Sequence, residues 1–289
     1  MEVSVFAPFA SPVILFFLLG LLASALRSDL AIPEAIAKGM SLYLMAAIGL
    51  KGGVAVAKSG VNAEVGAALL AGLTLSFLIP VLAYGALRSF GKLDQANAGA
   101  VAAHYGSVSV VTFVTANELL GASGLAVAGF MVAVLAVMET PAILSGLMLA
   151  RRGQASAGQS RGELLREVFL NASVVLLLGS FAIGLIASPK GYAEVQPLFE
   201  GGFKGVLCLF LLDMGLIAAR RLIDARALNL RLVTLAIAFP LFNGTLGVLV
   251  GNLIGLDAAT AAALGVLCAS ASYIAVPAAM RLALPQADP

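Results

Sequence analysis

Nine apolar segments divide this sequence, and each is long enough to cross the hydrocarbon core of a bilayer, which is about 30 Å thick. They lie near residues 5–26, 33–57, 64–88, 96–117, 122–150, 168–188, 197–220, 228–253 and 258–283. Hydrophobic residues make up 61% of the chain and charged residues 11%, which excludes an ordinary soluble globular domain. Because a lipid-exposed segment of this length satisfies its backbone polar groups as a helix, the sequence predicts an all-α polytopic membrane protein.

Two serine clusters interrupt the apolar pattern, one in the fourth segment and one in the ninth. The first reads GSVS at 106–109 and the second SASY at 270–273, so they are about 163 residues apart. Glycine and small hydroxyl residues at bilayer depth allow a helix to break, and the freed N–H groups of a half-helix can hold an anion. Alternatively, these small residues only allow close helix packing. The candidate substrate-binding residues are Gly106, Ser107, Val108, Ser109, Ser270, Ala271, Ser272 and Tyr273.

The basic residues are distributed unevenly between the two sides that the segments define. If the N-terminus is outside, the outside loops contain Lys51, Lys58 and Lys190. The cytoplasmic loops and flanks then contain Arg27, Arg88, Lys92, Arg151, Arg152, Arg161, Arg166, Arg220, Arg221, Arg226, Arg231 and Arg281. Because cytoplasmic loops carry an excess of Lys and Arg, we expect a multi-pass protein of the inner (plasma) membrane with its N-terminus outside.

The two halves of the chain have matching features in opposite orientations. Under this topology the first segment runs inward and the sixth runs outward. Pro33 matches Pro197 at an offset of about 164 residues. Pro80 matches Pro240 at about 160. This pattern favours two inverted repeats of five helices, an arrangement known from secondary transporters. The expected units are a first repeat over 1–150, a cytoplasmic linker over 151–167 and a second repeat over 168–289 that lacks its last helix.

Glu139 is an acidic residue inside the fifth apolar segment. It lies about 12 residues, or roughly 18 Å of helix, from the basic boundary at Arg151. An ionisable group near the middle of the bilayer is a functional candidate, because an unpaired charge there is costly. Thr140 and a carbonyl freed by Pro141 are further oxygen ligands of the kind that hard cations prefer. We therefore interpret Glu139 and Thr140 as a candidate Na⁺ site.

Four other polar or aromatic residues in the apolar segments each allow a functional and a structural interpretation. His104 and Tyr105 directly precede the first serine cluster, where the histidine is either a packing residue or a ligand or proton relay. Asp213 lies about two turns inside the boundary at Arg220, so pairing with arginine is its structural interpretation. Asn243 either bends the eighth segment or lines a gate, and the sequence leaves both open.

Five short motifs, in register over nearly the whole chain, carry a resemblance to a known family. They are IPEAI at 32–36, IGLKGG at 48–53, GSVS at 106–109, METPA at 138–142 and ASAS at 269–272, the last followed by Pro277 and RLALP at 281–285. In these motifs the chain resembles the sodium-dependent bicarbonate transporter (SbtA-type) family. It departs from the family pattern at Tyr273, where the family has an acidic residue, and in its shorter loop over 151–167.

The resemblance implies a core domain that moves against a gate domain, helices that break and cross at the membrane midplane, and a homotrimer. It also implies uptake of bicarbonate by alternating access, with Na⁺ as the coupling ion and no other cofactor. In some members of the family a cytoplasmic PII-like protein regulates transport, so a regulator of this kind is a further expected partner.

Other classes of function fit the residues to different degrees. A Na⁺- or H⁺-coupled carrier of another small anion, such as a short carboxylate, needs the same kind of site. An anion channel does not require paired broken helices and a buried acid. One histidine and no HExxH pattern argue against an enzyme. The net charge of +2, with no Lys/Arg-rich run, argues against nucleic-acid binding.

Overall fold

The computed structural model describes residues 11–60, 62–152, 172–224 and 230–272, together with Val276, Met280, Leu284 and Ala287. Over these residues the secondary structure is helical, and no strand occurs among them. The predicted all-α class is therefore confirmed. Most of the predicted linker over 151–167 and the candidate residue Tyr273 lie outside the described residues.

The described helices correspond closely to the predicted apolar segments. They are α1 (Pro12–Ala25), α2 (Glu34–Ser59), α3 (Ala63–Ser89), α4 (Gln95–Gly106), α5 (Val110–Ala122), α6 (Met131–Ala150), α8 (Ala172–Ile186), α9 (Pro189–Gln196), the π-helical turn η2 (Pro197–Gly201), α10 (Phe203–Asp224), α11 (Leu230–Leu253) and α12 (Ala258–Ala269). Six stretches of the described chain are long and apolar enough to cross a membrane, and α1, α12 and most of α8 are shorter apolar helices. These lengths support a multi-pass membrane protein.

Two predicted segment boundaries are wrong. The fifth segment is predicted from 122, but α5 continues to Ala122, and α6 begins only at Met131. Between them Gly124 has φ 77°, a left-handed conformation that glycine adopts without strain and that commonly follows a helix end. The seventh segment is predicted to begin at Pro197, but this residue joins α9 to η2, and α10 begins at Phe203. Proline lacks the N–H of a regular helical hydrogen bond, which favours the local π-helical turn.

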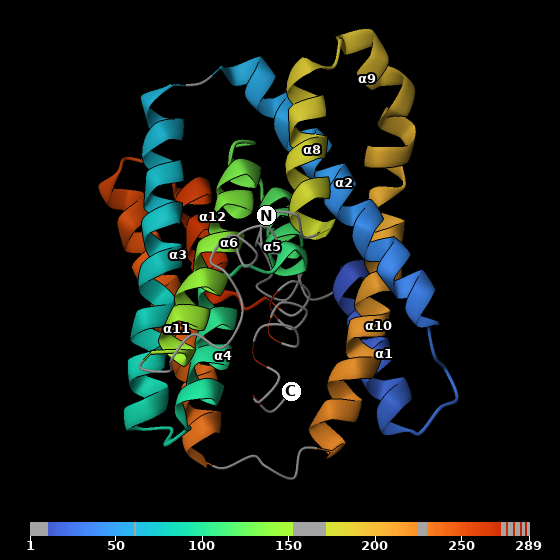
Figure 1. Ribbon diagram of the computed structural model, residues 1–289. Coiled ribbons are helices and arrows are strands. Elements are labelled where there is room, and N and C mark those ends of the chain that lie inside the picture. Colours follow the sequence, from blue (N-terminus) through green and yellow to red (C-terminus); the bar gives the residue numbers. More distant parts are fainter. Residues whose placement is uncertain are drawn as a thin grey trace.

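The helices pack in two groups (Figure 1). In the first group α2 packs along α8, and α1 packs along α10. The second group consists of α3, α4, α5, α6, α11 and α12, in which α6 packs against α3 and α4, and α11 against α12. α6 also contacts α2 and α8, so it joins the second group to the first.

Glycine pairs allow the helices of the first group to approach closely. A Cβ atom on Gly53 of α2 would lie 2.0 Å from the Phe181 carbonyl oxygen and 2.9 Å from Cα of Gly184 in α8. Gly20 of α1 and Gly215 of α10 meet in the same way, since a Cβ on either would lie 3.1 Å from the other's Cα. Small residues at helix crossings are typical of membrane proteins, where close packing is a main source of helix association.

We expect Gly53→Ala to destabilise the protein by about 1–3 kcal/mol, because the added methyl group overlaps a backbone carbonyl that cannot rotate away. The matched control is Gly66→Ala in α3, where an added Cβ meets no atom within 4 Å. The measurement is the midpoint of thermal unfolding of each variant in detergent. Equal midpoints for the two variants would show that the α2–α8 crossing tolerates a wider separation.

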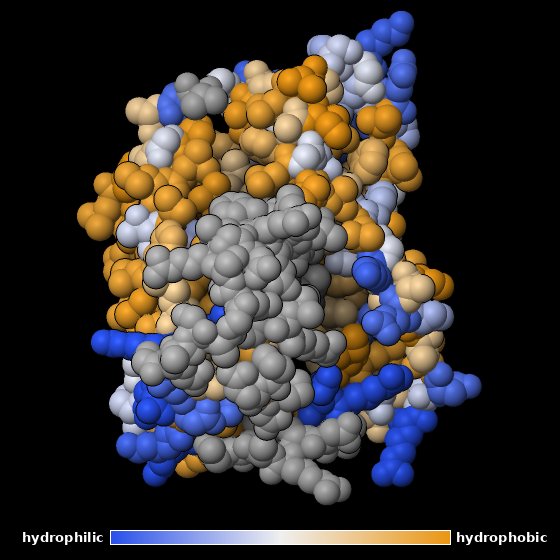
Figure 2. Space-filling view, viewed as in Figure 1, coloured by the Kyte–Doolittle hydropathy of each residue, from blue (hydrophilic) through white to orange (hydrophobic). Residues whose placement is uncertain are grey.

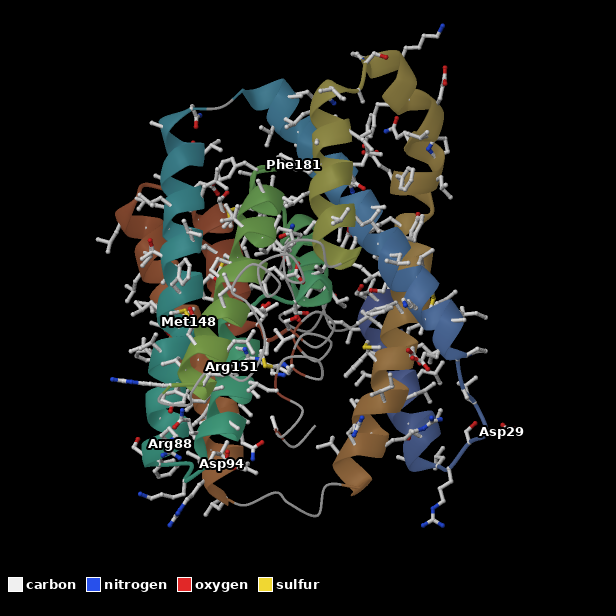
Figure 3. The ribbon with its side chains drawn as sticks, viewed as in Figure 1. Asp29, Arg88, Asp94, Met148, Arg151 and Phe181 are labelled. Atoms are coloured by element: carbon white, nitrogen blue, oxygen red, sulfur yellow. The ribbon has the colours of Figure 1, made fainter. Side chains whose placement is uncertain are left out.

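The surface is divided into an apolar middle and polar ends, as a bilayer requires (Figure 2). Large apolar side chains are exposed along α3 and α11, among them Leu70, Phe77, Ile237, Leu241 and Leu249. This exposure is compatible with lipid, whose tails are as apolar as leucine. Figure 3 shows Arg88 and Asp94 at the lower left and Asp29 at the lower right, so the α1–α2 and α3–α4 connections lie toward the same end of the molecule.

Candidate substrate and cation site

The first serine cluster ends one helix and begins the next. α4 ends at Gly106, and Ser107 (φ −86°, ψ 155°) and Ser109 (φ −102°, ψ 110°) are extended. The Ser109 hydroxyl oxygen accepts hydrogen bonds from the Thr112 backbone N–H at 3.2 Å and from Thr112 Oγ1 at 2.9 Å. Ser109 is therefore the N-cap of α5, a position that serine favours. The fourth apolar segment thus breaks where its serine cluster predicts.

Gly106 is required at this break because two helices approach it. A Cβ atom there would lie 2.2 Å from Cγ of Pro80 in α3 and 2.9 Å from Cβ of Ala142 in α6. This contact holds the break in the interior, where Ser107 is 0% and Ser109 is 3% exposed. Gly106 therefore has a packing role, whatever it contributes to substrate.

The second serine cluster ends α12 in a similar way. α12 ends at Ala269, and Ser270 is extended (φ −75°, ψ 161°). The Ser270 hydroxyl donates to the Leu267 carbonyl at 2.8 Å, which satisfies one of the carbonyls left free at a helix end. Ala271 and Ser272 continue outside the helix, and Ser272 is 2% exposed. Both clusters therefore interrupt helices and bury their serines.

The two breaks are in direct contact although they are more than 160 residues apart in sequence. The Ser109 N–H donates to the Ser270 hydroxyl oxygen at 3.0 Å. The Ser272 N–H donates to the His104 carbonyl at 3.0 Å, and His104 Nδ1 bonds to the Ser272 carbonyl. The sequence-predicted residues of the two clusters therefore form one connected polar region in an apolar interior.

Ser107 differs from Ser109 and Ser270. Its hydroxyl oxygen is buried and has no hydrogen-bond partner among the described residues, whereas Ser109 Oγ and Ser270 Oγ are both engaged. A buried hydroxyl without a partner costs roughly 1–3 kcal/mol. Such a group is usually explained by a ligand, an ion or a water. Among the described residues, Ser107 thus offers a buried hydroxyl that no other group engages.

Glu139 is buried in α6, where it is 3% exposed and its Oε2 has no partner among the described residues. The preceding residue, Met138, receives a hydrogen bond on its carbonyl from the Ser76 hydroxyl of α3. Pro141 has no N–H, so the helical bond to the Val137 carbonyl is missing. An unpartnered carboxylate oxygen beside a freed carbonyl matches the preference of hard cations for oxygen.

The described residues contain no group of three or more His, Cys, Asp or Glu that could hold a metal ion. A cation near Glu139 would therefore depend on hydroxyl and carbonyl oxygens for its other ligands, which is usual for Na⁺ and unusual for a transition metal. The side chain of Thr140, the other predicted Na⁺ ligand, lies outside the described part of the chain.

The other candidates lie in different surroundings. Tyr105 packs its ring on Phe239 of α11, with ring centroids 4.6 Å apart. Asn243 is 2% exposed, and its Nδ2 has no partner among the described residues, while α11 continues through it without a break. Asp213 is buried in α10, and Arg220, one of the arginines predicted to pair with it, donates a hydrogen bond to the Leu30 carbonyl at 3.1 Å.

Sequence reasoning missed two aspartates that begin the helices leading to the breaks. Asp94 caps α4 and Asp257 caps α12, and both helices have 12 residues. The hydrogen bond from the Asn97 backbone N–H lowers the pKa of Asp94, and the bond from the Thr260 hydroxyl lowers the pKa of Asp257. The two aspartates are about 163 residues apart, the same spacing as the serine clusters, and this spacing is a signal that the sequence contained.

An ion pair between the two helix groups was also missed. Nζ of Lys204, near the start of α10, lies 2.6 Å from Oε2 of Glu118 in α5. The Lys204 side chain is 68% exposed and that of Glu118 is 26% exposed. The partners are 86 positions apart, and no local pattern connects them. The pair shows that the C-terminal part of α5 lies within side-chain reach of the start of α10.

Interrupted helices that meet inside an all-helical membrane protein are typical of secondary transporters. The chain belongs to the Na⁺-dependent bicarbonate transporter superfamily, which matches residues 12–289. The resemblance carried by the five sequence motifs is therefore confirmed. Membership supports bicarbonate and Na⁺ as the transported species, and it indicates a transporter rather than an enzyme. No curated protein matches this chain.

Proposed function

We propose that this protein takes up bicarbonate by alternating access, coupled to Na⁺. The observation that carries the proposal is the contact between the two breaks, beside which the buried Ser107 hydroxyl has no partner among the described residues. Bicarbonate is small and singly charged, so a few N–H and O–H donors suffice to hold it. The first N–H groups of α5, at Val110 and Val111, have no intrahelical acceptor and supply such donors beside Ser107.

Glu139 is proposed to bind the coupling Na⁺ through its buried carboxylate. Its unpartnered Oε2 supports this role, because a buried carboxylate without a counter-charge is costly in an apolar interior. Thr140 and the Val137 carbonyl complete the proposed ligand set. Bound Na⁺ would offset the charge of Glu139 and so make anion uptake dependent on the cation.

The two halves are proposed to be inverted repeats. Matching contacts support this arrangement. The Gly20–Gly215 crossing of α1 with α10 corresponds to the Gly184–Gly53 crossing of α8 with α2, at offsets close to that of the serine clusters. The capped helices α4 and α12 correspond in length and in the break that follows each.

The first helix group is proposed to be the gate domain and the second the core domain. Their contact is lined by small residues, since a Cβ on Gly52 of α2 would lie 2.5 Å from Cβ of Val132 in α6. A Cβ on Gly129 would likewise lie 2.1 Å from Cβ of Ala55. Contact surfaces lined by small side chains allow one helix group to slide past another.

Cross-linking the two groups is expected to stop transport. The pair Glu118→Cys and Lys204→Cys, joined by a short reducible bifunctional thiol reagent, ties α5 to α10 where their ion pair lies. If the groups must move, uptake falls to background and returns when the cross-link is reduced. The control pair, Asn252→Cys and Ala258→Cys, ties α11 to α12 within one group and leaves uptake unchanged. Parental uptake by the cross-linked first pair would contradict alternating access between these groups.

The N-terminus is proposed to face outside, as the distribution of basic residues indicates. Single cysteines at Ser59 and Ser156 are expected to react with a membrane-impermeant thiol reagent from opposite sides of the membrane. Ser59 should react in intact cells and Ser156 only in inside-out vesicles. Labelling of both from the same side would contradict the inverted arrangement.

The experiment that tests this function also distinguishes it from two alternatives. A Na⁺- or H⁺-coupled carrier of a short carboxylate would use the same helix ends, and an anion channel would conduct without accumulating its substrate. Concentrative, Na⁺-dependent uptake of bicarbonate separates the proposed function from both. The homotrimer and the PII-like regulator stay predictions of the family resemblance.

A further inference from the structure

Two different sets of hydrogen bonds join the two breaks. From the first break to the second, the Ser109 N–H donates to the Ser270 hydroxyl oxygen at 3.0 Å. In the other direction, residue 104 makes two bonds to residue 272: its carbonyl accepts the Ser272 N–H, and its ring nitrogen Nδ1 meets the Ser272 carbonyl. A carbonyl oxygen only accepts, so Nδ1 must carry the proton in this contact.

The proposed repeat shows how the bonds between residues 104 and 272 depart from symmetry. Shifted by the spacing of the serine clusters, position 104 corresponds to Leu267, whose side chain has no hydrogen-bonding group. Ser107 likewise corresponds to Ser270, so full symmetry would have the Ser107 hydroxyl oxygen accept the Ser272 N–H. The His104 carbonyl accepts that N–H instead, and Ser107 Oγ is left without a partner.

We propose that His104 is a positioning residue, which fixes the second break against α4 through Ser272 and thereby frees the Ser107 hydroxyl for the anion. Its Nδ1–H is committed to a main-chain carbonyl, so this nitrogen is available neither to bind the anion nor to relay a proton. The part of this proposal that concerns the anion rests on the proposed function, whereas the hydrogen bonds between residues 104 and 272 do not depend on it.

Residues beyond the second break pack beside this tie. Val276 is 0% and Met280 is 6% exposed, and both belong to an apolar cluster with Ala100 and Ala103 of α4. Ala103 directly precedes His104, so the polar tie and the apolar cluster lie at adjacent positions of one helix. Together they hold the chain on both sides of Ser272 against α4, which keeps the two breaks in register.

The first test uses the parental protein and the fact that the chain contains one histidine. The imidazole ¹⁵N signals of protein carrying a histidine-free affinity tag, recorded at about pH 9 where a histidine of ordinary pKa is neutral, belong to His104 alone. We expect a protonated Nδ1 and an unprotonated Nε2. An unprotonated Nδ1 would overturn the proposal, because the Ser272 carbonyl can only accept a hydrogen bond from it. This test needs no substrate and no variant.

The second test compares His104→Asn, which keeps a donor near the position of Nδ1, with His104→Leu, which keeps bulk and removes the donor. In His104→Leu we expect amide hydrogen exchange at Ser272 to be about tenfold faster and the KM for bicarbonate to be about tenfold higher, with little change in maximal rate. His104→Asn should stay close to the parent in both. Parental behaviour of His104→Leu, or equal damage in both variants, would overturn the positioning role.

The two tests also separate this inference from the proposed function. If the parent has the expected tautomer and exchange but shows no Na⁺-dependent bicarbonate uptake, the proposed function fails and the tie remains. If uptake is present but Nδ1 is unprotonated, the function remains and the tie fails. Should His104→Leu not fold, the tautomer of the parental histidine still decides.

Discussion

Ser107→Leu is expected to abolish bicarbonate transport while the protein still inserts in the membrane. Ser107 is 0% exposed at the end of α4, and its hydroxyl is the unpartnered donor beside the start of α5. A leucine there would occupy the space between the helix ends and remove the donor. Uptake should fall to background at all substrate concentrations, measured in vesicles with equal amounts of protein. Ser89→Leu, at an exposed position of α3, is the control for bulk alone.

Alanine substitutions at Ser107 and Ser270 then separate binding from packing. Ser107→Ala removes a hydroxyl that no group engages in the described part of the chain, so it should raise the KM by about tenfold or more without lowering thermal stability. Ser270→Ala removes the acceptor of the Ser109 N–H, so it should lower stability by about 1–3 kcal/mol. If Ser107→Ala keeps the parental KM, the anion binds elsewhere.

Glu139→Gln is expected to remove most of the dependence of uptake on Na⁺. The substitution keeps the shape of the side chain and deletes a buried carboxylate in α6 whose Oε2 has no partner within the described ranges. Without that charge the site attracts a cation much less, so uptake driven by a Na⁺ gradient should fall at least about tenfold. Folding should change less than transport, because no protein ion pair is broken.

Asp213→Asn is the matched control for this prediction. Asp213 is also a buried carboxylate, at 5% exposed, but it lies on α10 in the other helix group. We expect a smaller effect on the Na⁺ dependence than for Glu139→Gln. An unchanged response of Glu139→Gln to Na⁺ would rule out its proposed role, and a larger loss for Asp213→Asn would move the cation to α10.

The helices and their interruptions could be predicted because they follow from local chemistry. Apolar runs of bilayer length become helices, and the serine clusters end α4 and α12 where the sequence indicates. The path around Pro197 could not be predicted in the same way. A proline is compatible both with a helix start and with a π-helical turn. Packing of the surrounding residues, such as the stacking of the Tyr43 ring on Phe199, decides between the two.

The bonds within the site depend on contacts between distant segments, which a single sequence does not reveal. The four serines lie at matching positions and look equivalent in the sequence. In the structure, the contact of Ser272 with His104 distinguishes the surroundings of Ser107 from those of Ser270. The ion pair between Glu118 and Lys204 could not be predicted from the sequence either, because the partners belong to different helix groups. Sequence spacing therefore identified the residues of the region, whereas their individual roles required the fold.

The central claim is tested most directly by uptake of labelled bicarbonate into proteoliposomes that contain this protein alone. The account predicts accumulation above the outside concentration when Na⁺ is higher outside, and equilibration alone when Na⁺ is equal on both sides or replaced by K⁺. Ser107→Leu, reconstituted at the same density, supplies the background. Accumulation independent of Na⁺, equilibration under every gradient, or accumulation of a short carboxylate in place of bicarbonate would contradict it.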